Sequence, residues 1–493
     1  MSERIGITRL GVQLERDPAR VITKPFLPGE ETLLDGRSRV EVVLHRVLLM
    51  GDDEVEPALA SVLDRFSLRH HNLRSILKRN YKLVTDRVSD LPEMSEKRRL
   101  LVGAYFTHEY SIEAAALFNP SMIPDPDQSG ACEGEVRFIM SLRAVGEGHI
   151  SSIEFRNGII DAQGEARFVP LSEYATIGQR RSPTFDRGLF RDKLAELGVL
   201  NIVSEHILGR LRSGFTMPDL DSVIASLDGE VLDQVMQAET VRILHLLANS
   251  NYIVAFPEDT KMSERVLFPS GPYESHGMED ARFVRFVDDD GSVMYYATYT
   301  AWDGVKIIPQ LIETRDFRAF RVATLNGQAV QNKGMALFPR KVAGRYLMLS
   351  RSDRENIDLM YSDHVREWQS SERISVPIKA WELIQIGNCG SPIETEAGWL
   401  VLTHGVGPMR TYSIGALLLD LENPSRVIGQ LTEPLLSPDD SERDGYVPNV
   451  VYSCGGMVHG GSLFMPYGFS DMGARIARVD LGELLDTLQS GGI

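Results

Sequence analysis

The sequence predicts a mainly β fold that carries helical segments in its N-terminal half. From about residue 252 onward, short runs of alternating or β-branched residues recur, among them RFVRFV, VMYYATYT and GWLVLTH. Glycine, Asp-Gly and Pro-Asp turn signals separate these runs, which is the pattern of many short antiparallel strands. Several blocks share a loose repeat of about 50 residues, close to the size of a propeller blade. This texture is typical of a sandwich, a barrel or a propeller, and the repeat favours the propeller only modestly.

The N-terminal half alternates between helical and β character. Residues 56–88 and 101–118 carry apolar residues at three- and four-residue spacings, which predicts helices. Residues 134–170 have the pattern of strands joined by tight turns, and residues 186–250 return to helical character. We therefore expect a mixed, largely helical N-terminal extension, a first β block, a helical insertion and a remaining β domain, at residues 1–130, 131–185, 186–250 and 251–493.

Composition argues against several classes of function. The net charge of −17, from 52 basic and 69 acidic residues, disfavours nucleic acid or an anionic membrane as a partner, because both need a basic surface. Cys132, Cys389 and Cys454 form no CxxC pair, so neither a disulfide framework nor a zinc site is expected. The N-terminus lacks the apolar core of a signal peptide, and no apolar run approaches the roughly 18 residues that span a bilayer. We expect a soluble, cytoplasmic protein.

The stretch HGMEDARFVRF places Glu279 and Asp280 side by side, just ahead of Arg282 and a strand-like run. For an isolated pair of this kind, a solvated turn with a salt bridge is the simplest explanation. If the stretch begins a strand, side-chain alternation puts Asp280 and Arg282 on one face and Glu279 on the other. Asp280 would then project into a cavity, with Arg282 near enough to hold it or a substrate anion.

Two later stretches gather further polar residues at strand ends. In QNKGMALFPRKVAGRYLMLSRSDREN, Lys333 and Arg351 are either solvated bases or two sides of an anion cradle. In IGNCGSPIETEAGWLVLTHGVGPMRTY, small residues allow the backbone to approach a ligand. The polar candidates of this stretch are Asn388, His404, Arg410 and Tyr412. A lone histidine is more often a structural residue than a catalytic one. The sequence contains no GxGxxG after a strand, no P-loop, no HExxH and no GxSxG.

Taken in order, six stretches resemble glycoside hydrolase family 130, which comprises β-mannoside phosphorylases and some β-mannosidases. They are HGMEDARFVRF, YYATYTAWDG, NKGMALFPRKVAGRYLMLSR, GSPIETEAGWLVLTHGV, ALLLDLENPSRVIGQLTEPLL and GYVPNVVYSCGG, within residues 252–480. The resemblance implies a five-bladed β-propeller with its active site at the central axis, to which a helical N-terminal region and a helical insertion are added. Residues 131–185 would contain the first blade.

The resemblance also implies roles for individual residues. Asp280 matches the catalytic acid of the GxEDxR motif, which in the phosphorylases protonates the glycosidic oxygen through a sugar hydroxyl. Inorganic phosphate would attack the anomeric carbon and invert it, so that a β-mannoside, with a β-1,2 linkage expected, gives α-mannose 1-phosphate. Lys333 and Arg351 match phosphate-binding positions. Substrate binding is expected of Arg282, Trp302, Asp303, Asn388, His404, Arg410 and Tyr446. Neither a metal nor a cofactor is implied beyond phosphate as co-substrate.

Three departures from the family pattern leave phosphorolysis and hydrolysis both open. Ser350 stands where the family has a histidine, and Ala281 stands where it has the proline of EDPR. Trp302-Asp303-Gly304 occupies the place where well-studied phosphorylases carry an arginine.

Each alternative has its own requirement. A β-mannosidase would need a carboxylate base to activate water, for which Glu355, Glu382 and Glu394 are available. A sugar-binding propeller without catalysis is a more distant alternative, and it would need no acid at residue 280. A helical N-terminal extension is the kind of segment that mediates self-association, so a homo-oligomer is among the expected assemblies.

Overall fold

The structure is a computed structural model that describes residues 5–29, 38–88, 91–227 and 234–490. Its internal contacts divide the chain into two compact units. The smaller unit comprises residues 17–114 and 172–177, and the larger one comprises residues 1–16, 115–171 and 178–493. Within the described ranges, no helix has both the length and the apolar character needed to cross a membrane.

The smaller unit consists of four helices and a two-stranded antiparallel sheet. The helices are α1 (Arg39–Leu49), α2 (Asp52–Phe66), α3 (Leu73–Thr85) and α4 (Glu96–Tyr105), and the paired strands are β2 (Val21–Pro25) and β3 (Thr107–Ser111). The short strand β8 (Thr176–Ile177) also belongs to this unit but not to that sheet. Helix α1 begins at Ser38, which forms a capping box with Glu41. Helices α3 and α4 approach closely at Gly103, where a Cβ atom would lie 2.0 Å from the carbonyl oxygen of Leu77.

The helix predicted over residues 101–118 is wrong beyond Tyr105. Residues 107–111 form β3, which pairs with β2, and β4 (Ala116–Pro124) pairs with β5 (Val136–Val145). Strand pairing therefore overrides the helical spacing of the apolar residues. The expected extension over residues 1–130 thus includes two strands of the larger unit, β4 and β1 (Ile7–Glu15).

The larger unit is built mainly from antiparallel sheets, which confirms the mainly β fold. Eleven strands of this unit lie in one sheet, which runs through β4, β5, β6 (Ser151–Ile160), β14 (Gly277–Val287), β15 (Val293–Trp302), β16 (Ile307–Thr314), β17 (Ala319–Thr324), β12 (Tyr252–Ala255) and β9 (Gln179–Arg181), with β7 (Ala166–Phe168) and β13 (Arg265–Leu267) paired to β6. Strands β6 and β14 join through a single parallel pair, Ser151 with Gly277.

Three further sheets complete this unit. One contains β18 (Lys333–Leu337), β19 (Tyr346–Arg351), β20 (Ile357–Ser362) and β21 (Ser371–Ser375). The next contains β22 (Gln385–Asn388), β24 (Gly398–Val406), β25 (Tyr412–Leu419) and β26 (Val427–Gln430), with β23 (Ile393–Thr395) on β24. The last contains β1, β30 (Gly473–Asp480), β29 (Ser462–Phe469) and β27 (Val451–Tyr452), with β28 (Met457–His459) on β29. These sheets are open, and their division into five blades stays a prediction.

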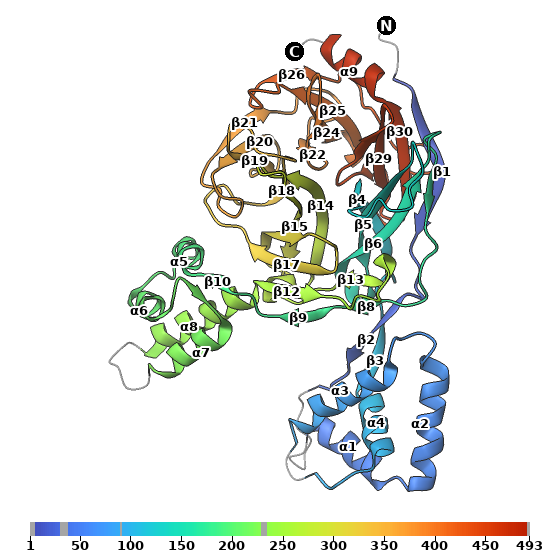
Figure 1. The fold of residues 1–493 in the computed structure, drawn as a ribbon, viewed down its shortest axis with the longest axis vertical. Helices are drawn as coiled ribbons and strands as arrows, with labels where there is room; N and C mark the ends of the chain where they lie inside the picture. Colours follow the sequence, from blue (N-terminus) through green and yellow to red (C-terminus); the bar gives the residue numbers. More distant parts are fainter. Residues whose placement is uncertain (1–4, 30–37, 89–90, 228–233, 491–493) are drawn as a thin grey trace. The chain divides into compact units, whose positions relative to one another are not determined.

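Strands β4, β14, β18 and β22, each the first strand along the chain of its group of neighbouring strands, contact one another, and Figure 1 shows them gathered in the middle of the larger unit. The amide of Phe283 in β14 donates to the hydroxyl of Ser121 in β4 at 3.1 Å. The amide of Cys454, beyond β27, donates to the carbonyl of Pro120 at 2.8 Å, and the amide of Met122 donates to that of Gly455 at 3.0 Å. The last sheet is therefore bonded to the first, which brings distant segments together around one centre.

Helices also occur in the larger unit. Residues 187–249 contain α5 (Arg187–Glu196), α6 (Ile202–Arg210), α7 (Met217–Ala225) and α8 (Gln234–Asn249), and the preceding β10 (Phe185–Asp186) pairs with β11 (Gly214–Phe215). They lie in the region where the sequence predicts a helical insertion. Asn201 and Thr216 cap α6 and α7 through their side chains. Helix α9 (Leu481–Ser490) follows β30 and buries Leu484 and Leu488.

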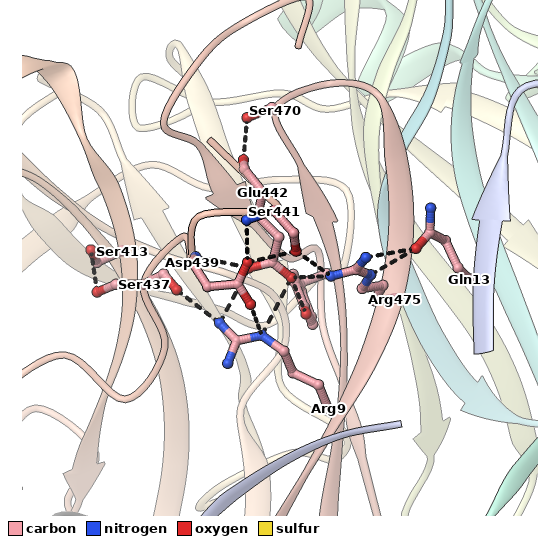
Figure 2. A network of polar contacts seen from close by, with 10 residues as sticks. Arg9, Gln13, Ser413, Ser437, Asp439, Ser441, Glu442, Ser470 and Arg475 are labelled. Atoms are coloured by element: carbon pink, nitrogen blue, oxygen red, sulfur yellow. Dashed lines mark hydrogen bonds and ion pairs between the residues drawn. The ribbon is translucent and has the colours of Figure 1, made fainter. Parts of the chain in front are cut away.

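A buried carboxylate ties the N-terminal strand to the C-terminal sheet (Figure 2). Glu442 is fully buried and accepts hydrogen bonds from Arg9 of β1 at 3.2 Å and Arg475 of β30 at 2.9 Å. The hydroxyl of Tyr467 in β29 donates to the same carboxylate at 2.6 Å. Arg475 also donates to Gln13 of β1 at 2.7 Å. Since a buried charge is tolerated only when it is paired, these contacts hold β1 against β30.

Replacing Glu442 by Gln should therefore lower the free energy of unfolding by about 3 kcal/mol, because two arginines lose the charge that they share. Chemical denaturation of both proteins measures the difference. Glu433→Gln, at an exposed glutamate of the same connecting segment, is the control and should change stability by less than about 0.5 kcal/mol. Equal stabilities of the Glu442 variant and the native protein would contradict this role.

Candidate active site

A polar cavity of about 230 Å³ opens where the first strands of the sheets meet. It is lined by Phe118, Asn119, Arg143, Asp280, Lys333, Arg351, Gln385, His404, Arg410, Tyr412, Val447, Val450, Tyr452 and Asp471. These residues come from every large sheet of the larger unit. The smaller unit holds a different cavity of about 400 Å³, but its walls are mostly leucine, alanine and other apolar side chains, which do not suit a sugar.

A β-bulge in β14 brings two consecutive carboxylates, Glu279 and Asp280, to the same arginine, and Asp280 lines the cavity. Glu279 pairs with Thr300 of β15, whereas Arg282 pairs with Thr298, so three steps on one strand oppose two on the other. Asp280 lies within the bulge and has a φ of 56°, in the left-handed region. The bulge breaks the strict alternation of side chains. The prediction that Glu279 points away from Asp280 is therefore wrong, since both carboxylates bind the same arginine.

That arginine is Arg143 of β5. Its Nη2 donates to Glu279 Oε1 at 2.7 Å, and its Nη1 lies 3.4 Å from Asp280 Oδ1. Its Nε donates to the hydroxyl of Ser151 at 2.9 Å, which fixes the plane of the guanidinium. The second oxygen of Glu279 accepts from the ammonium of Lys333 at 2.7 Å. The two cations and two carboxylates thus form one connected array across β5, β14 and β18.

The carboxylate of Asp280 is buried but held in its charged form. The side-chain amide of Asn119 donates to Oδ1 at 2.7 Å. Burial raises the pKa of Asp280, but Arg143, Lys333 and the Asn119 hydrogen bond together outweigh burial, so the pKa lies below its ordinary value. Asp280 is therefore ionised at neutral pH when the cavity holds no ligand.

Asp471 is a second carboxylate of the cavity and behaves differently. It lies in the turn between β29 and β30 with a φ of 52°. Burial raises the pKa of Asp471 to about 6, although the charge of Arg143 opposes this shift. Two carboxylates whose environments separate their pKa values in this way are typical of sites that move protons.

Arg351, the cross-strand partner of Lys333, also lines the cavity, and among the described residues no carboxylate forms an ion pair with it. Arg351 of β19 donates from Nη1 to His404 Nε2 at 3.0 Å. Burial and the charge of Arg351 hold the pKa of His404 well below its ordinary value, so the ring is neutral and accepts this bond. Gly387 leaves room for the pair, because a Cβ atom there would lie 2.5 Å from His404 Cε1 and 3.1 Å from Arg351 Cδ.

The structure brings together six of the residues that the sequence singles out. Asp280, Lys333, Arg351, His404 and Arg410 all line the cavity, as does Tyr412 of the wider candidate set. Arg282 is buried beside them: it borders a small recess with Asp280 and Lys333 and donates to the hydroxyl of Tyr452 at 2.7 Å.

Besides Arg282, four predicted substrate-binding residues do not line the cavity. Trp302 is 36% exposed at the end of β15, beside the ring of His276. Asp303 accepts the backbone amides of a tight turn, and Asn388 is fully buried with its amide on the carbonyl of Gly390. Tyr446 is exposed, and its hydroxyl lies 3.3 Å from the ring of His149.

The three glutamates considered as hydrolytic bases also lie outside the cavity lining. Glu382 is fully buried and accepts the amides of two neighbouring residues. Glu394 forms an ion pair with Arg340 at 2.6 Å, and Glu355 is exposed.

Sequence reasoning missed Asn119, Arg143, Tyr452 and Asp471. Arg143 had a local signal, since it is a lone charge in the apolar run FIMSLRAV. Asn119 had a weaker one in the Asn-Pro step of FNPSM. Asp471 gave no signal, because its place in the cavity follows from the contact between the last sheet and the first. In the described part of the chain, no group of three or more His, Cys, Asp or Glu is placed to hold a metal ion.

Comparison with known proteins finds one family for the β region. The family model of glycoside hydrolase family 130, described as beta-1,4-mannooligosaccharide phosphorylase, matches residues 239–490. A 1,2-beta-oligomannan phosphorylase of a Thermoanaerobacter species is 33% identical over 45% of this chain and 75% of its own length. A beta-1,2-mannobiose phosphorylase of Listeria innocua is 30% identical over 45% of this chain and 63% of its own length.

A solved structure is also similar, that of the beta-1,2-mannobiose phosphorylase of Listeria innocua with beta-1,2-mannobiose. It aligns with 77% of this chain and 93% of its own chain, at 22% identity and a TM-score of 0.46. The family match includes Asp280, Lys333 and Arg351, whereas Asn119 and Arg143 lie N-terminal to the matched residues.

The raised pKa of Asp471 predicts a pH-dependent loss of stability. Because the folded protein binds this proton more tightly than the unfolded chain, Asp471 stabilises the fold below about pH 4, and the stabilisation is lost as the pH rises through about 6. Asp471→Asn keeps the shape without the charge. It should match the native protein in stability near pH 4 and exceed it by about 2 kcal/mol above pH 7.

Denaturation midpoints of both proteins across this pH range measure the effect. Asp444→Asn, at an exposed aspartate, should show no such pH-dependent difference. A constant gap between the Asp471 variant and the native protein would contradict the assignment.

Proposed function

The chain belongs to glycoside hydrolase family 130 and is an enzyme that acts on glycosides, and we propose that it catalyses the phosphorolysis of β-mannosides. In this reaction inorganic phosphate attacks the anomeric carbon of the terminal mannosyl unit and inverts it. The products are α-mannose 1-phosphate and the shortened saccharide. Two of the relatives carry β-1,2-linked mannosides in their names, so β-1,2-mannobiose is the first substrate to test and a β-1,4-linked mannobiose the second.

The excess of cations in the cavity supports this proposal most strongly. Arg143, Lys333, Arg351 and Arg410 line it, against the carboxylates Asp280 and Asp471 of the lining and Glu279, which binds Arg143 and Lys333, so four cations face three carboxylates. Sugar hydroxyls need no such charge, whereas phosphate carries a negative charge that is bound best by several fixed cations. Arg351 is especially suited, because within the described part of the chain its guanidinium bonds to the neutral imidazole of His404 and forms no ion pair, which leaves its charge uncompensated.

Proton donation is assigned to Asp280. The acid is ionised in the empty cavity, so it must first gain a proton. Phosphate bound next to Lys333 and Arg143 would offset the two charges that lower the pKa of Asp280, and the pKa would rise toward the range of a general acid. Asp280 then protonates the leaving oxygen through a hydroxyl of the mannosyl unit. Phosphate is already an anion at neutral pH and needs no protein base.

The arrangement is less favourable to a hydrolase. A β-mannosidase of inverting type needs a second carboxylate to activate water on the face opposite the acid. Glu355, Glu382 and Glu394 lie outside the cavity lining, so none of the three candidates is placed for that task. Asp471 does line the cavity, but it interacts with Arg143 and Asp280 and therefore lies near the acid.

Incubation with β-1,2-mannobiose, with and without phosphate, tests the function. We expect α-mannose 1-phosphate to form only when phosphate is present. Free mannose released at the same rate in both reactions would contradict phosphorolysis. Absence of turnover with either the β-1,2- or the β-1,4-linked mannobiose would contradict the substrate class.

Asp280→Asn should lower kcat by a factor of about 10²–10⁴, the usual contribution of a general acid, and should leave mannobiose binding within about threefold. Calorimetric titration of the inactive variant measures that binding. A variant that retains native turnover would exclude Asp280 as the acid.

A further inference from the structure

Glu279 is a buried carboxylate that the proposed reaction does not use directly. It is 6% exposed, and each of its oxygens holds one cation: Oε1 accepts from Arg143 at 2.7 Å and Oε2 from Lys333 at 2.7 Å. Burying a carboxylate costs free energy unless its partners compensate its charge. The proposed chemistry uses only Asp280, so the presence of a second buried carboxylate calls for an explanation.

The sharing of Arg143 between the two carboxylates is unequal. Its short contact, 2.7 Å, is with Glu279, whereas its contact with Asp280 is 3.4 Å long. Asp280 has its short hydrogen bond from Asn119, which is neutral. A guanidinium that faced Asp280 alone could form the bidentate ion pair that arginine favours. Glu279 prevents this by drawing one edge of the guanidinium, and the ammonium of Lys333, toward itself.

We propose that Glu279 is a positioning residue for proton donation, which holds Arg143 and Lys333 so that neither closes a full ion pair on Asp280. The inference rests on the proposed function, because it assigns Glu279 a part in the same reaction. Glu279 touches neither the leaving oxygen nor the anomeric carbon in this scheme. It acts through the two cations and through its own charge.

Two physical effects of Glu279 have the same sign. Its negative charge next to Asp280 disfavours a second negative charge, and its hold on Arg143 weakens the contact that favours the ionised form of Asp280. Both make Asp280 easier to protonate. The charged and titratable groups around Asp280 are Glu279 and Arg282 of β14, Arg143 of β5, Lys333 of β18, and Tyr452, Cys454 and Asp471 of the last sheet. Among them, Glu279 alone is bonded to both cations that lower the pKa of Asp280 most.

Glu279→Gln removes the charge and keeps the shape. Because the general acid would be harder to protonate, kcat should fall by about tenfold at neutral pH. In the plot of kcat against pH, the fall in rate on the basic side should move to lower pH by about one unit. The KM for β-1,2-mannobiose should stay within about twofold, because the sugar is held elsewhere in the cavity. Initial rates of α-mannose 1-phosphate formation from pH 5 to pH 9 measure these quantities.

Glu442→Gln is the matched control. Glu442 also bridges two cations while buried, but between Arg9 and Arg475, outside the cavity. Its replacement should lower stability and leave the fall in kcat on the basic side at its native pH when rates are measured below the unfolding temperature. If kcat of Glu279→Gln falls on the basic side at the same pH as in the native protein, whatever the loss of rate, Glu279 is only a structural residue and the inference is overturned.

Glu279→Asp tests the same inference if the Glu279→Gln variant does not fold. Aspartate retains the charge but is one methylene shorter, so it cannot reach both Arg143 and Lys333 in their present places. The fall in kcat on the basic side should move in the same direction by a smaller amount, and an unchanged profile would overturn the inference. Failure of the proposed function is distinguishable, since the native protein itself would then form no α-mannose 1-phosphate.

Discussion

The guanidinium of Arg143 binds Glu279 and Asp280, two carboxylates that follow each other in the chain, and the candidate site depends on these contacts. Adjacent carboxylates in a buried cavity repel each other and lose hydration, so they persist there only beside fixed cations. Arg143 from β5 and Lys333 from β18 supply that charge. In the proposed reaction the same two cations would also attract the incoming phosphate, so the stability of the empty cavity and the affinity for phosphate would depend on one arrangement.

Such an arrangement requires the sheets to stay in place relative to one another. Ion pairs of 2.7 Å between β5, β14 and β18 tolerate little displacement. The bonds of Phe283 to Ser121 and of Cys454 to Pro120 fix the first strands, and the pairing of β1 with β30 joins the N-terminal strand to the last sheet. Glu442 secures that pairing.

Local sequence patterns and the order of the motifs were sufficient to predict the fold class and part of the candidate site. Short alternating runs predict the mainly β class, and the order of the motifs places Asp280, Lys333 and Arg351 in one cavity, as the structure has them. The lone charge of Arg143 in an apolar run marked it as unusual, but its pairing with Asp280 could not be predicted, because the two residues lie 137 positions apart and the strand of Arg143 lies outside the family match. The direction of Glu279 was mispredicted because strand alternation assumes a regular ladder, whereas the bulge at Asp280 adds a residue. Positions set by sheet-to-sheet contact, such as Asp471, leave no local trace.

Whether the cations around Asp280 form a phosphate site can be seen directly in a crystal structure of the protein grown with saturating phosphate. We expect a phosphate ion in the cavity, with oxygens at hydrogen-bond distance, about 3 Å, from Lys333 Nζ and from the guanidinium of Arg351. A well-ordered structure at the same phosphate concentration in which the cavity holds only water, or in which phosphate binds at a place remote from Asp280, would contradict the assignment.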